Sequence, residues 1–216
     1  TRFVLMNVEG KDCGQDESLP LAYSFVDEWM LSRLQQTESA MADAFNTYRF
    51  DLAAQTIYEF VWNEYCDWYV ELAKVQLNSG DEASQRATRR VLVRVLEVIL
   101  RLLHPIMPFI TEELWQTVAP LANAKHTDSI MVASWPVADA SKIKQDSLDK
   151  MAVLQDLMGA VRNLRGEMNL GPAVKAPLLI EGGAELDVYL PYLPMMARLS
   201  EVKRVDVLPE DDAPVV

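Results

Sequence analysis

Apolar residues recur at every third or fourth position through most of the first 170 residues, which is the spacing of amphipathic helices. This pattern predicts a first helix over residues 19–47, with Ser18 as its cap and Pro20 in its first turn. A second helix should begin at a capping Asp51 and end at "NSGD", where Gly80 is suited to the left-handed closing position. We therefore expect long helices joined by short loops.

The third predicted helix is capped by Asp81, and its second half is so apolar that neighbouring helices should enclose it. It runs into "HPIMPFITEELWQ". Pro105 disfavours the α conformation at His104, while Pro108 has the preset backbone angle of a helix start, so a fourth helix should begin there. In this interpretation His104 belongs to the turn between two helices and needs no catalytic role. We assign structural roles to His104, Pro105, Pro108 and Trp115.

The pattern changes after a fifth predicted helix over residues 147–168. Beyond Gly171, "APLLIEG" and "VKRVDVLP" predict short strands with a proline-interrupted helical piece between them. The expected fold is mainly α: an antiparallel helix bundle followed by a small α+β unit. We place the bundle at 1–145, and the long helix with a truncated α+β unit at 146–216.

Composition narrows the function. The formal charge of −12 argues against broad, non-specific capture of nucleic acid, although a local basic patch is compatible with it. Two histidines and two distant cysteines, Cys13 and Cys66, do not form a metal-site pattern. No apolar run is long enough for a membrane span, and both chain ends suggest a piece of a longer protein. We expect a cytoplasmic location and no membrane partner.

No catalytic motif is recognisable, so binding is the better hypothesis. The segment "WNEYCDWYVE" holds more aromatic surface than one helix face buries. Tyr65 and Trp68 fit the core by their spacing, whereas Trp62 and Tyr69 need another neighbour. Extra aromatics could stack on bases or could pack in the core, which is the commoner use of such residues; the sequence leaves both open.

Four arginines near the start of the third predicted helix are the second candidate. Arg86, Arg90 and Arg94 follow at four-residue spacing, with Arg89 beside them. Such a row can follow an RNA phosphate backbone, and it can equally be a solvated face paired with carboxylates. We carry Arg86, Arg90 and Arg94 forward as candidate backbone contacts.

Four segments in order give the chain a close resemblance to bacterial valyl-tRNA synthetases: "RFVLMNVEGKDCG", "YRFDLAAQTIYEFVWNEYCDWYVELAK", "ILRLLHPIMPFITEELWQ" and "VRNLRGEMNLGP". The "HPIMPF" segment is shared in looser form with the isoleucine and leucine enzymes, whereas "EYCDWYVE" with "RNLRGEMN" is more specific. The resemblance implies the anticodon-binding domain of a class I aminoacyl-tRNA synthetase, without the catalytic and editing domains.

The resemblance also implies partners and site residues. The parent enzyme would ligate valine to tRNA(Val) with ATP and magnesium, while this fragment would hold no cofactor and be inactive alone. Its expected partners are tRNA(Val) and the remainder of the synthetase chain, in a monomer. Phe3 is assigned to stacking on an anticodon base, Arg2 to a phosphate or base, and Val70 and Glu71 to the facing wall. Two alternatives stay open: a helical protein-interaction or scaffold module, and the equivalent isoleucyl- or leucyl-tRNA synthetase domain.

Overall fold

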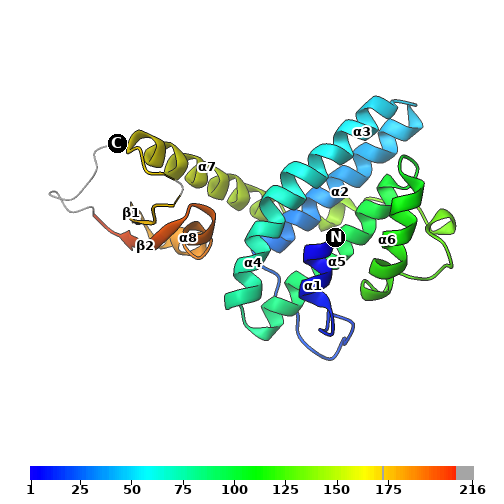
Figure 1. Cartoon of the computed structure of the whole chain (residues 1–216), viewed down its shortest axis with the longest axis horizontal. Coiled ribbons are helices and arrows are strands. Elements are labelled where there is room, and N and C mark those ends of the chain that lie inside the picture. The colour runs from blue at the N-terminus through cyan, green and yellow to red at the C-terminus, as the bar shows by residue number, and fades with distance from the viewer. Residues whose placement is uncertain (172, 208–216) are drawn as a thin grey trace. The chain divides into compact units, whose positions relative to one another are not determined.

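The computed structural model describes residues 1–171 and 173–207, and it divides into two compact units, Thr1–Leu148 and the residues from Asp149 onward (Figure 1). The first unit is helical. Its elements are α1 (Arg2–Val8), α2 (Phe25–Asn46), α3 (Phe50–Glu59), η1 (Phe60–Tyr69), α4 (Val70–Ser79), α5 (Glu82–Leu103), α6 (Pro108–Leu121), η2 (Ile130–Val132) and η3 (Ala140–Lys142). Helix α7 (Gln145–Glu167) carries the chain into the second unit.

The second unit is small and mixed. It holds the rest of α7, then β1 (Ala176–Glu181), η4 (Ala184–Val188), α8 (Leu193–Met196) and β2 (Leu199–Val205). The two strands pair in parallel, with Leu178 opposite Val202. Arg165 near the end of α7 donates to the carbonyls of Gly171 and Val174, which fixes the turn before β1. The predicted fold class, a mainly α bundle followed by a small α+β unit, is confirmed.

Helix α5 is the centre of the first unit, because α1, α2, α3, α4 and α6 all pack against it (Figure 1). The predicted enclosure of its apolar second half is confirmed: Leu92, Val95 and Leu102 have no exposed surface. Burial of these side chains against five neighbouring helices stabilises the bundle through the hydrophobic effect.

The predicted start of α2 was wrong. Ser18 and Pro20 lie in the loop before the helix, and Ser24 is the cap: its Oγ accepts from the Asp27 amide, while the Asp27 carboxylate accepts from the Ser24 amide. This reciprocal pair satisfies two amides that a helix start otherwise leaves open. Ser18 has no such partner three residues on, and its hydroxyl donates to Asp16 instead.

Two other helix ends also differ from the prediction. Arg49 precedes α3 without a side-chain cap, and Asp51 lies in the first turn, where it pairs with Arg49 at 2.7 Å. Gly80 has a φ of −70° rather than a positive value, so the left-handed prediction was wrong. A Cβ at Gly80 would lie 2.5 Å from the Gln76 carbonyl oxygen, and this close approach is why glycine fits. Asp81 caps α5 as predicted, accepting from the Ser84 amide.

The aromatic segment adopts a π-helix, η1, which changes which residues face the core. A π-turn holds more residues than an α-turn, so Phe60, Tyr65 and Tyr69 are buried on one face. Tyr65 was predicted correctly. Tyr69 lies in the core where Trp68 was expected, and Trp68 is half-buried, while Trp62 is 56% exposed.

The helical conformation continues through the histidine of "HPIMP", where the sequence predicted that it would end. His104 keeps the α conformation, with φ −56° and ψ −40°, so the prediction that Pro105 would exclude it was wrong. The change of direction occurs at Met107, whose φ of −132° and ψ of 70° place Pro108 at the start of α6 as predicted. The Met107 amide still donates to the Leu103 carbonyl, which keeps the turn tight.

Candidate nucleic-acid interface

Helix α1 brings Phe3 to the surface of α4. The ammonium of Lys74 lies over the Phe3 ring, 5.5 Å from its centroid, and the same ammonium pairs with the Glu71 carboxylate at 2.5 Å. Phe3 and Glu71, which the family resemblance assigns to one site, are thus linked through Lys74. Sequence reasoning missed Lys74, although its i+3 spacing from Glu71 puts both on one helix face.

This cluster of Phe3, Glu71 and Lys74 is open to solvent. Phe3 is half-buried, and the side chains of Glu71 and Lys74 are 41% and 33% exposed. An aromatic face beside a carboxylate acceptor and an ammonium donor can stack on a base and bind its polar edge. A cation over an aromatic ring is also favourable in itself, so an incoming base competes with Lys74 or uses the other face of Phe3.

The other two predicted site residues, Arg2 and Val70, flank the cluster. Arg2 is exposed on α1 and, within the described residues, has no hydrogen-bond or ion-pair partner. Val70 is half-buried at the first position of α4, directly before Glu71. On the adjacent π-helix, burial raises the pKa of the Cys66 thiol, which keeps the neutral form. The exposed guanidinium of Arg2 is therefore available to a phosphate.

The arginine row of α5 divides into buried and exposed members. Arg86 is 2% exposed, and its guanidinium donates to the Asp12 carboxylate and to the carbonyls of Pro20 and Asp16. Arg89 is 3% exposed and donates to the Asp12 carbonyl and the Glu82 carboxylate. A guanidinium this buried, with three acceptors, is not available to a phosphate in this structure, so we do not carry Arg86 forward as an RNA-backbone contact.

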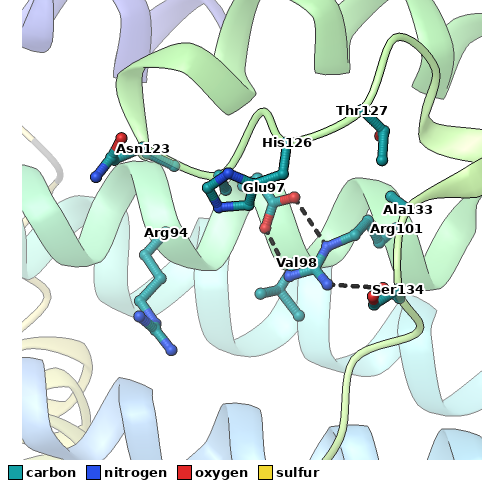
Figure 2. Close-up of a pocket in the computed structure, with 11 residues that line it drawn as sticks. Arg94, Glu97, Val98, Arg101, Asn123, His126, Thr127, Ala133 and Ser134 are labelled. Carbon is teal, nitrogen blue, oxygen red and sulfur yellow. Dashed lines mark hydrogen bonds and ion pairs between the residues drawn. The ribbon is translucent and has the colours of Figure 1, made fainter.

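Arg90 and Arg94 remain accessible. Arg90 donates to the Gly14 carbonyl and lines a pocket together with Arg94. Arg94 is exposed, and its side chain has no hydrogen-bond partner among the residues that the structure describes. It also lines a cavity of about 300 Å³ whose other walls include Asn123 and His126 (Figure 2). These side chains can donate to an anion.

The residues predicted to be structural lie inside the bundle or at its corner. The indole of Trp115 is fully buried, and its Nε1–H donates to Glu97 at 2.9 Å. Glu97 also pairs with Arg101, which reaches the Ser134 carbonyl (Figure 2). His104 Nδ1 lies 2.8 Å from Thr111 Oγ1. The Thr111 hydroxyl has one proton and lies closest to the Met107 carbonyl at 2.7 Å, so His104 is the donor in their bond.

Within residues 1–171 and 173–207, no group of three His, Cys, Asp or Glu side chains is arranged to hold a metal ion. None of the helices in that part of the chain combines the length and apolar character that crossing a membrane requires.

Comparison with known proteins shows the family of the chain. Residues 27–180 match the family model described as the anticodon-binding domain of tRNA ligase. The chain is 70% identical to the valine–tRNA ligase of Laribacter hongkongensis, 68% to that of Chromobacterium violaceum and 61% to that of Neisseria meningitidis serogroup B, with the whole chain covered in each case. It spans 23% of the length of each relative. The chain therefore belongs to the family of anticodon-binding domains of tRNA ligases.

Proposed function

We propose that this chain is the part of a valine–tRNA ligase that recognises the anticodon of tRNA(Val). Its membership in the anticodon-binding family supports RNA recognition, and the high identity to proteins named valine–tRNA ligase supports valine over isoleucine or leucine. The observation that carries the proposal is the cluster itself: Phe3 lies beside Glu71, with Lys74 joining them.

The cluster fits the chemistry of an anticodon base. Valine codons have uracil in the middle, so the matching anticodon base is adenine. Its ring can stack on Phe3, and its exocyclic amine can donate to Glu71. Val70 would form the apolar wall, and Arg2 would hold a phosphate of the same loop.

Arg90 and Arg94 would contact the RNA backbone at a second place. Both line the same pocket, and Arg94 is exposed. Because the chain carries a net charge of −12, phosphate contacts must come from such local groups rather than from the overall field. The binding energy would then come chiefly from stacking and base contacts, with a shallow salt dependence.

The complete enzyme would ligate valine to tRNA(Val) with ATP and magnesium in the cytoplasm, as a monomer. In this proposal the chain described here holds no cofactor and supplies no catalytic residue. Its contribution is to bind the anticodon loop, so that only tRNAs with a valine anticodon are retained long enough for aminoacylation elsewhere in the enzyme.

The test is a fluorescence-anisotropy titration of this chain with a tRNA(Val) anticodon stem-loop and with the same RNA changed at the middle base. We expect Phe3→Ala to weaken cognate binding about 5- to 100-fold, the range for loss of one base–aromatic stack. Glu71→Gln should reduce the preference for adenine. The matched control is Phe109→Ala on α6, because Phe109 is 90% exposed and lies outside the proposed site.

Equal affinity for both RNAs, or equal losses from Phe3→Ala and Phe109→Ala, would contradict the proposal. The scaffold alternative predicts no response to either RNA. A preference for an isoleucine or leucine anticodon would indicate that the chain belongs to an isoleucyl- or leucyl-tRNA synthetase instead.

A further inference from the structure

The N-terminal loop (residues 9–24) connects α1 to α2, and α5 holds it at several separate points. Arg86 contributes three of them, because its guanidinium reaches the Asp12 carboxylate, the Asp16 carbonyl and the Pro20 carbonyl. Burial opposes ionisation of Asp12, but the hydrogen bonds from Arg86 and two loop amides outweigh it and lower the pKa of that carboxyl. Asp12 is therefore a charged partner of Arg86 near neutral pH.

Two neighbouring arginines, Arg89 and Arg90, also bind the N-terminal loop. Arg89 donates to the Asp12 carbonyl at 2.9 Å, and Arg90 donates to the Gly14 carbonyl. Gly14 has a φ of +81°, and a Cβ there would lie 2.8 Å from Arg90 Cδ, so both the backbone and the space require glycine. The three arginines and the glycine therefore together constrain the conformation of the loop.

Helix α1 depends on this loop for its position. It has seven residues and no side-chain cap at its N-terminus, and a helix of this length has little stability of its own. Only Val4 and Val8 are anchored in the core. Phe3 lies on this short helix, whereas Glu71 and Lys74 lie on α4, so their separation depends on where α1 is held.

We propose that Arg86 and Arg89 are positioning residues for anticodon recognition. They fix the N-terminal loop, the loop fixes α1, and α1 presents Phe3 to the base opposite Glu71. Neither arginine touches RNA. This inference rests on the proposed function, and it assigns to the buried arginines a role that differs from the phosphate contact expected of their row.

The planar fork of arginine is the reason a lysine cannot substitute. A guanidinium presents donors in fixed directions and can serve three acceptors at once, while an ammonium keeps the charge but not that geometry. Arg86→Lys therefore loosens the loop without leaving Asp12 beside a neutral side chain. Gly14→Ala loosens the same loop from its other side, without changing any arginine.

The experiment is a double-mutant cycle with Phe3→Ala, read as affinity of this chain for the cognate stem-loop. Arg86→Lys alone should weaken binding about threefold to tenfold, in the range of coupling between residues of one network. In the Phe3→Ala background the same change should have no further effect. Hydrogen exchange of the α1 amides should accelerate in Arg86→Lys, and Arg204→Lys in β2 serves as the matched control.

The outcomes separate the two proposals. If Arg86→Lys and Gly14→Ala weaken binding equally with and without Phe3, or leave binding and α1 exchange unchanged, the positioning role is overturned while the anticodon site stands. If Phe3→Ala itself has no effect, the proposed site fails and the positioning role falls with it. Should Arg86→Lys not fold, the Gly14→Ala cycle decides the question by the same criterion.

Discussion

The indole Nε1–H of Trp115 on α6 donates to Glu97 on α5 across 2.9 Å, with both side chains almost completely buried. Glu97 is also paired with Arg101, so the carboxylate has two partners. A buried carboxylate is tolerable only when its oxygens are satisfied. This pair therefore helps to fix α6 on α5.

Trp115→Phe should destabilise the chain by about 1–3 kcal/mol, because it leaves a buried acceptor without one of its donors and removes some volume. Urea denaturation followed by circular dichroism measures the change. The control is Trp62→Phe, since Trp62 is 56% exposed and has no comparable buried partner among the described residues. Equal losses in the two variants would contradict the role of the Glu97 bond.

Glu38 predicts a pH dependence of stability. Its side chain is 5% exposed on α2, and one carboxylate oxygen has no hydrogen-bond partner among the described residues. Burial raises the pKa of Glu38 to about 7, against the lowering influence of Arg101, Arg94 and Lys142. The folded chain therefore keeps a proton that the unfolded chain releases near pH 4.5.

The stability contribution of this proton is largest below about pH 4.5 and is lost as pH rises to about 7. Glu38→Gln cannot titrate, so this decline should disappear. The difference in free energy of unfolding between Glu38→Gln and the wild type should shift by about 2 kcal/mol in favour of the variant from pH 5 to pH 8. Urea titrations at both pH values measure it, with the exposed Glu113→Gln as control. Parallel pH profiles for wild type and Glu38→Gln would refute the assignment.

Arg86→Ala should mainly reduce folding stability, whereas Arg94→Ala should mainly change RNA binding. Arg86→Ala removes a buried guanidinium from Asp12 and two carbonyls, and it should cost about 2–4 kcal/mol of folding stability. Arg94→Ala should leave stability within about 0.5 kcal/mol and reduce the salt dependence of RNA binding by about one unit of slope. Thermal melts and titrations at several salt concentrations distinguish these effects. A stable Arg86→Ala variant with a reduced salt slope would restore the original expectation.

His104 should matter to stability and not to binding. Its ring donates to Thr111 Oγ1, which ties the end of α5 to the first turn of α6. His104→Ala should cost about 1 kcal/mol, the usual net value of one hydrogen bond. The affinity for the cognate stem-loop should not change. A selective loss of binding in a variant of undiminished stability would assign the histidine a functional role after all.

Local spacing predicted the long helices and the two strands, and the preset backbone angle of proline predicted the start of α6 at Pro108, whereas the short helix α1 was not predicted. The errors at Ser24 and Gly80 have a different origin. Several residues near each helix end could have served as its cap. The residue that does so is the one with a suitable hydrogen-bond partner, as Ser24 has in Asp27. Tyr69 entered the core in place of Trp68 because a π-helix altered the phase.

The sequence by itself determined the fold class, the family resemblance, and Phe3 and Glu71 as candidate site residues. Only the tertiary structure divided the arginines of α5. All four have the same charge and similar spacing, but the N-terminal loop covers Arg86 and Arg89 and supplies their acceptors, while Arg94 faces solvent. Helical spacing fixes the direction of a side chain along its own helix, whereas burial depends on which distant segment folds over it.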